Sequence, residues 1–228
     1  MSDLNPITIV REEWSVFREH ALGQIPTLAK GWLLRAALPA AAFYTVVVFS
    51  LVFYGASILE IITDPEIPEG RAWYRGIMST LGVVIWLACG AICIFTAWCI
   101  RGRESLAQFR PLLIAGGILT LMLTSDDGLM LHDRLKHQPT FYLTYALLSM
   151  FIVLRFFRSL QKMDFMALVL SGGCLAMSIF VDLIQMEIPV AYPTSQFFEE
   201  GFKFIGIIGW SYFWIRTCRN LVDGSLES

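Results

Sequence analysis

The sequence has few charged residues and few histidines, and each shortage argues against a class of protein. Only 16% of its 228 residues are charged, whereas a soluble domain has about 25%. The net charge of -2 argues against nucleic-acid binding, which needs a strongly basic face. Three histidines and five cysteines without a C-x-x-C pair do not make a zinc-finger pattern. The cysteines are interpreted as small, buried apolar side chains.

Apolar residues are abundant, at 56% of the chain with a mean hydropathy of +0.62, and they form long continuous runs. A helix needs about 20 mostly apolar residues to cross a bilayer core of about 30 Å. Strands of a membrane barrel alternate instead in segments of about ten residues. The sequence therefore predicts an all-α, polytopic membrane protein, a bundle of six transmembrane helices. The predicted spans are residues 34–56, 77–100, 111–131, 140–157, 165–186 and 197–218.

The segments outside these spans predict how the chain enters the membrane. Residues 1–33 mix charged and apolar residues and predict a short amphipathic helix at the membrane surface. Residues 219–228 predict a short tail. Twelve of the seventeen Lys and Arg residues lie in the N-terminal segment, the second and fourth loops and the C-terminal segment. Cytoplasmic loops are rich in these residues, so both termini are expected to be cytoplasmic, with the protein in the plasma (inner) membrane.

Ionisable residues inside the predicted spans gather towards the outer face. Asp127, Asp182 and Glu199 lie on three different spans, each about 25 Å from the cytoplasmic side. Lys203 lies one turn deeper. The full candidate site comprises Asp126, Asp127, His132, Asp182, Glu199, Glu200 and Lys203, with Thr124, Ser178 and Gln185 in support. One lysine does not neutralise several acids, so the excess negative charge must be protonated, hydrated or bound to a cation.

The first functional hypothesis is a divalent-metal-dependent, hydrolase-like membrane enzyme. Its predicted metal ligands are Asp127, His132, Asp182 and Glu199. Such a mixed ligand set suits Zn, Mg, Mn or Fe and does not distinguish among them. Asp127, Glu199 and Glu200 are the predicted catalytic residues, with either glutamate as the general base for a metal-bound water. The position near the lipid headgroups predicts an amphipathic or lipid-like substrate.

Two alternatives use the same residues. The first is a proton- or cation-translocating protein, although the cytoplasmic halves of the spans are almost purely apolar in sequence. The second is a non-catalytic accessory subunit of a membrane complex, in which the polar residues serve only packing. Membrane lipids are the expected partners in every case, joined by other membrane subunits in the second alternative. Helical spacing favours Glu199 over Glu200 as the neighbour of Lys203, because Glu199 lies four residues before it.

Overall fold

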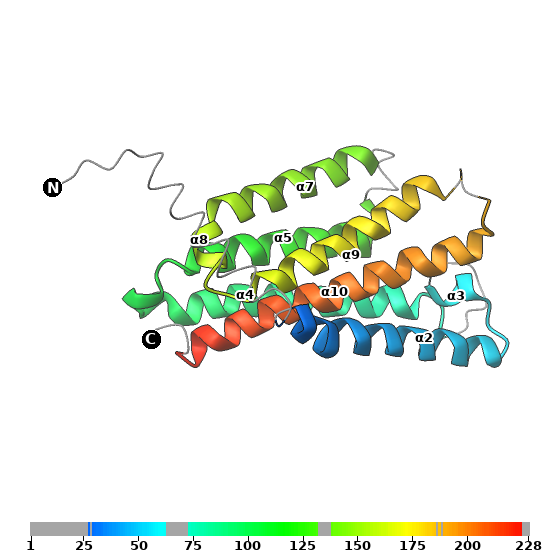
Figure 1. Cartoon of the computed structure of the whole chain (residues 1–228), viewed down its shortest axis with the longest axis horizontal. Helices are drawn as coiled ribbons and strands as arrows, with labels where there is room; N and C mark the ends of the chain where they lie inside the picture. The colour runs from blue at the N-terminus through cyan, green and yellow to red at the C-terminus, as the bar shows by residue number, and fades with distance from the viewer. Residues whose placement is uncertain are drawn as a thin grey trace.

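The computed structural model describes residues 27, 29–62, 73–131, 138–185, 187 and 189–224. Within these residues the regular secondary structure is helical and contains no strand, which confirms the all-α prediction. The long helices run along one common axis and alternate in direction (Figure 1). Most of the predicted N-terminal amphipathic segment, residues 1–26 and 28, lies outside the described residues, as do residues 225–228 of the predicted tail.

The helices follow one another along the chain in a fixed order. They are η1 (Leu33–Ala37), α2 (Leu38–Phe53), α3 (Ile58–Ile62), α4 (Ile77–Cys99), η2 (Ile100–Gly102), η3 (Glu104–Leu106), α5 (Arg110–Leu129), α7 (Gln138–Arg155), α8 (Phe157–Leu160), α9 (Phe165–Ile184) and α10 (Tyr192–Val222). The π-helical turn η1 runs directly into α2. Pro39 stands at the start of α2 and has no N–H to donate to the carbonyl of Arg35, so the regular ladder cannot continue there.

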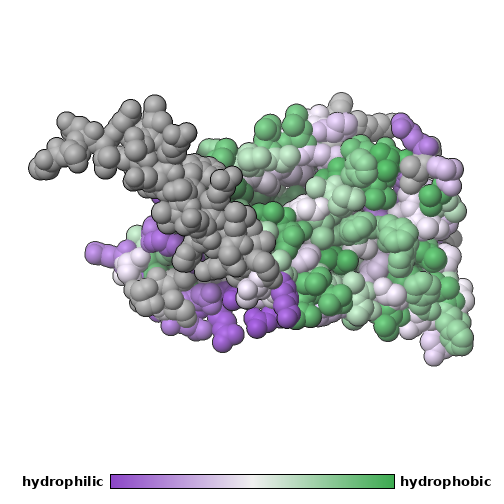
Figure 2. All heavy atoms as spheres, viewed as in Figure 1, coloured by the Kyte–Doolittle hydropathy of each residue, from purple (hydrophilic) through white to green (hydrophobic). Residues whose placement is uncertain are grey.

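Four helical segments are long and apolar enough to cross a membrane, which indicates a membrane protein. They are Ala29–Phe53, Ile77–Gly102, Arg110–Leu129 and Phe165–Ile184. The apolar helix Pro139–Arg155 is shorter. Helix α10 has 31 residues, which is ample length, but its ionisable residues make it less apolar. The structure thus supports four of the six predicted spans by length and composition. Apolar side chains cover much of the visible surface, and hydrophilic ones gather near the end where α10 terminates (Figure 2).

Helix α10 lies at the centre of the bundle, where it packs against α9, α4, α2 and α3, and α4 in turn packs against α5. Close approach of these helices depends on glycines. A Cβ at Gly116 of α5 would lie 2.2 Å from the Trp214 ring of α10, and one at Gly206 of α10 would lie 2.7 Å from Leu175 of α9. Glycine at position 206 therefore lets the backbones of α9 and α10 approach closely, whereas glycine at position 116 makes room on α5 for the Trp214 ring of α10.

Helices α5 and α10 are antiparallel, and their contacts fix a register. Asp127 contacts Lys203, Thr120 accepts a hydrogen bond from the Trp210 indole, and Gly116 meets Trp214. Each step back along α5 is matched by an equal step forward along α10. Helix α5 ends at Leu129, two residues before the predicted boundary, because Met130 adopts left-handed geometry (φ 50°). The helix therefore ends two residues after Asp127.

Candidate functional site

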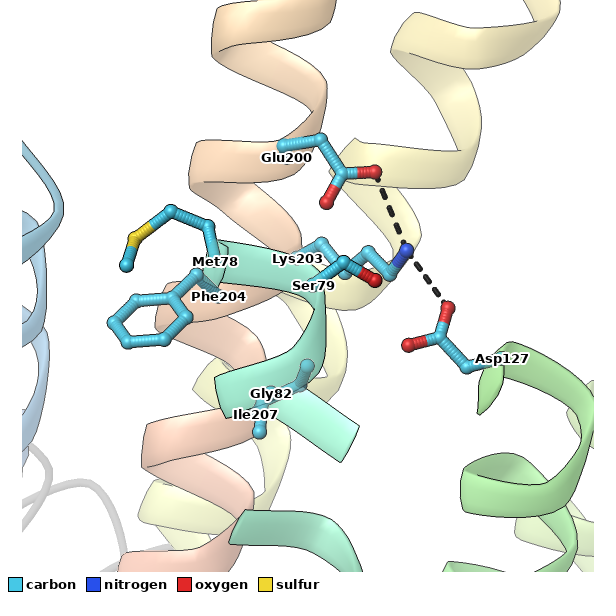
Figure 3. A pocket seen from close by; sticks show the side chains of 8 residues that line it. All are labelled: Met78, Ser79, Gly82, Asp127, Glu200, Lys203, Phe204 and Ile207. Atoms are coloured by element: carbon cyan, nitrogen blue, oxygen red, sulfur yellow. Dashed lines mark hydrogen bonds and ion pairs between the residues drawn. The ribbon is translucent and has the colours of Figure 1, made fainter. Parts of the chain in front are cut away.

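A lysine between two carboxylates forms the centre of the site. Lys203 of α10 places its Nζ 2.7 Å from Asp127 Oδ1 of α5 and 3.2 Å from Glu200 Oε1, one turn earlier on α10. Figure 3 shows the lysine side chain directed between the two acids, with Ser79 of α4 beside it. Three helices therefore meet at one ion-pair cluster, which we call the acid–lysine site: Asp127, Glu200, Lys203 and Ser79.

The acid–lysine site is largely removed from solvent within the bundle. The side chains of Asp127, Glu200 and Lys203 are 8%, 12% and 18% exposed. A cavity of about 10 Å³ adjoins them and is also lined by Met78, Gly82, Phe204 and Ile207. That volume is about the space of one water molecule. Asp127 Oδ2 is buried without a hydrogen-bond partner among the described residues, so this carboxylate has a free acceptor beside the cavity.

A second polar network joins α7, α9 and α10 at the same end of the bundle. Asp182 accepts hydrogen bonds from the Tyr142 hydroxyl (3.3 Å) and from Gln185 Nε2 (2.7 Å). Gln196 Nε2 lies 2.8 Å from Gln185 Oε1 and 2.6 Å from Glu199 Oε2. Asp182 and Glu199 are thus connected through two amide side chains. Glu199 and Glu200 are adjacent in sequence, so α10 carries both networks on neighbouring faces.

The structure brings part of the predicted site together. Asp127, Glu200 and Lys203 meet, whereas Asp182 and Glu199 belong to the second network. The neighbour of Lys203 described in the structure is Glu200, three residues before it, and not the expected Glu199. Three supporting residues are also placed: Thr124 donates to its own helix at Thr120 O, Gln185 bonds Asp182, and Ser178 is buried on α9. Asp126 is buried and interacts with Tyr145 of α7.

The predicted metal ligands are only partly described, because His132 lies outside the described residues. Among the described residues, no group of three or more His, Cys, Asp or Glu is arranged to hold a metal ion. Lys203 supplies the positive charge between Asp127 and Glu200 instead. A buried carboxylate is in general much cheaper to bury once it is protonated, so proton binding is one chemistry open to an arrangement of this kind.

Sequence reasoning missed three residues that the structure places at these networks: Ser79, Tyr142 and Gln196. Ser79 and its neighbour Thr80 lie near the start of the otherwise apolar helix α4, and two adjacent hydroxyl residues do not share a face of a helix. Gln196 had a usable signal, since it lies three residues before Glu199 and therefore on the same side of a helix. Tyr142 had none, because its partner Asp182 is on another helix.

The comparisons with known proteins bear on the family of the chain. No curated protein and no solved structure matches it. The model of one family, described as Domain of unknown function (DUF8692), matches residues 37–217. This stretch takes in η1 in part and every later helix through most of α10, with both polar networks. Since the match covers well over half of the sequence, the chain belongs to the DUF8692 family.

Proposed function

We propose that this protein is a six-span membrane protein that binds and translocates protons through the acid–lysine site. Two lengths support six spans: α7 has 18 residues and α10 has 31, or about 27 Å and 46 Å at 1.5 Å per residue. The Lys and Arg residues before α2, between α4 and α5, between α7 and α9 and at the end of α10 would then share one side. That side would be cytoplasmic, with membrane lipids around the apolar faces and the plasma (inner) membrane as location.

The observation that carries the function is an imbalance of charge. Among the residues that the structure describes, Lys203 offers one positive charge to Asp127 and Glu200. Asp182 and Glu199 add two more acids, whose hydrogen-bond partners there are the uncharged Tyr142, Gln185 and Gln196. Burying an unpaired carboxylate costs several kcal/mol, so uptake of protons is the most direct way to balance these groups. Intramembrane acids with a lysine are typical of proton pathways.

The size of the cavity favours protons over larger cargo. About 10 Å³ accommodates a water molecule, which can deliver a proton to Asp127 Oδ2. A lipid-like substrate needs a far larger pocket. The metal-dependent alternative stays a prediction for Asp127, His132, Asp182 and Glu199, because a divalent cation would also balance the second network. Metal analysis of the purified protein tests it: stoichiometric bound metal would support the enzyme, and none before or after addition of divalent ions would remove it.

Proton flux into liposomes tests the proposal. Purified protein is reconstituted with a pH-sensitive dye inside the vesicles, and a potassium diffusion potential drives protons inward. The wild type should acidify the lumen faster than protein-free vesicles, and Asp127→Asn should abolish the difference. Asp223→Asn is the matched control, because this carboxylate is exposed and pairs with Arg219 at the end of α10. Wild-type vesicles without flux, or equal loss in both variants, would refute translocation; the former would favour the accessory-subunit alternative.

A further inference from the structure

Helices α4 and α10 run parallel (Figure 1) and share a seam whose register can be fixed at both ends. At the outer end, a Cβ on Gly82 would lie 2.9 Å from Ile207 Cδ1. At the inner end, the Cys93 and Cys218 thiols interact. The steps from Gly82 to Cys93 and from Ile207 to Cys218 are both eleven residues, or three helical turns. We call this contact line the α4–α10 seam.

Because the two contacts are eleven residues apart on both α4 and α10, the residues between them lie opposite each other across the seam. On α4 the inward stripe continues through Trp86, and on α10 it continues through Ser211 and Trp214, at intervals of three and four residues. Trp86 therefore lies level with Ser211, and Trp214 lies one turn below. All three are nearly fully buried, with exposed fractions of 4%, 4% and 1%.

These three residues have polar atoms without protein partners. Within the described part of the chain, Trp86 Nε1, Ser211 Oγ and Trp214 Nε1 are buried and make no hydrogen bond. Buried polar groups in proteins are otherwise nearly always bonded. Three such atoms gathered within about one turn of the same seam need a shared explanation.

Several comparable groups elsewhere in the bundle are satisfied, although the Ser195 hydroxyl, nearer the start of α10, also makes no hydrogen bond among the described residues. The hydroxyls of Thr120, Thr124 and Ser171 donate to the carbonyl four residues earlier, but the Ser211 hydroxyl does not. The indoles of Trp32 and Trp210 donate to Ser171 Oγ and Thr120 Oγ1, at 3.0 and 2.9 Å. Ser211 and Trp86 thus lack the hydrogen-bond partners that these similar residues have. A buried water forms hydrogen bonds with two to four polar groups, and the unpartnered hydroxyl and indole N–H could supply two of them.

We propose that the α4–α10 seam holds an internal water site between Trp86 and Ser211, extended by Trp214, that relays protons between the acid–lysine site and the inner end of the bundle. The relay rests on the proposed function, whereas the water site does not. Only Ser211 and the water can pass a proton, each accepting one on oxygen while releasing its own. The indoles donate hydrogen bonds that hold the water.

The contact of Gly82 with Ile207 lies between the two hydrated points. Figure 3 shows both residues below Lys203 and Asp127. From Lys203 to Ser211 is eight residues, or about 12 Å along α10. One apolar layer therefore separates the cavity at Asp127 from the proposed water at Ser211. A proton passes between them only when a further water enters this layer, accepts the proton on one side and releases one on the other, so the layer limits passive leakage along the seam.

Water contact of the indole N–H groups tests the site without any flux. The protein is labelled with ¹⁵N-tryptophan in nanodiscs, and Trp86→Phe and Trp214→Phe assign the two signals. Magnetisation exchange with water should reach the Trp86 and Trp214 N–H protons, and should be absent for Trp32 and Trp210, which bond protein oxygens. Ser211→Val should remove the Trp86 water signal while those of Trp32 and Trp210 stay unshifted. No water contact at Trp86 in the wild type would overturn the water site.

The relay is tested separately in the liposome assay. Ser211→Val should slow proton flux by about tenfold, and Ser125→Val should leave it unchanged, since Ser125 is exposed on α5 and bonds its own helix at Leu121 O. Water contact at Trp86 with normal flux in Ser211→Val would overturn the relay and leave the water site in place. Absence of flux in the wild type would overturn the proposed function and the relay together, while the indole signals still decide the water site.

Discussion

Replacement of Lys203 by methionine should test the acid–lysine site most directly, because it removes one charge at nearly constant length. At an effective dielectric constant of about 20, charges 2.7 Å apart attract by about 6 kcal/mol. Desolvation of both partners offsets part of this attraction. Breaking a buried pair by removing one member costs about 3–5 kcal/mol, because the other charge stays buried and unpaired. Lys203→Met should therefore lower the free energy of unfolding by about 3–5 kcal/mol at neutral pH.

The measurement is equilibrium unfolding by SDS in mixed micelles, followed by circular dichroism. The double variant Lys203→Met/Asp127→Asn should be more stable than Lys203→Met alone. Lys162→Met is the control, because this exposed lysine lies 6.0 Å from the Phe109 ring and should contribute no more than about 1 kcal/mol. Equal losses for Lys203→Met and Lys162→Met, or no recovery in the double variant, would refute the pairing.

Two further predictions concern packing and a contact outside the spans. Gly116→Ala should destabilise the protein by about 1–3 kcal/mol, because the new methyl group would clash with Trp214. Gly172→Ala should be neutral or stabilising by about 1 kcal/mol, because no atom lies within 4 Å of the added Cβ. Equilibrium denaturation of the two variants measures both effects. Hydrogen bonds from the Ser57 backbone and from Arg75 hold the pKa of Glu60 below its ordinary value. The ion pair between Glu60 and Arg75 should therefore be complete above the ordinary pKa of glutamate. It should be lost as the pH falls through the lowered pKa of Glu60. Carboxyl NMR should show that pKa rising in Arg75→Gln.

Helix positions were predictable where a long apolar run had to be buried in lipid or protein. Helices α4 and α9 begin at the predicted residues, Ile77 and Phe165, because polar or glycine-containing loops precede them. Boundaries set by local backbone geometry were harder to predict. The left-handed residue Met130 that ends α5 carries no glycine or asparagine signal. Helix α10 begins five residues before its predicted span, since its polar first turns read as a loop.

The candidate site was predictable as a group but not in its pairings. The count of charges in the spans selected Asp127, Glu200 and Lys203. Acids and a lysine inside apolar spans are expected to pair, because an unpaired buried charge is costly in any packing arrangement. Which glutamate meets Lys203 depends on the rotation of α10. Glu199 and Glu200 differ by about 100°, and both i+3 and i+4 spacings allow a pair. Contacts of α10 with α4, α5 and α9 select Glu200, and those contacts are tertiary.

The position of α10 inside the bundle explains why the helix with the least apolar sequence carries the site. Helix α10 packs against helices on several sides, so many of its residues face protein and need not be apolar to be removed from lipid. Peripheral helices such as α2 and α9 face lipid and must be apolar to remain in the membrane. A central helix can thus carry three ionisable residues, Glu199, Glu200 and Lys203, at a lower energetic cost than a peripheral helix, whereas α9 carries only Asp182. In this bundle, low hydropathy in a long helix therefore indicates interior position, and interior position is what allows ion pairs to form there.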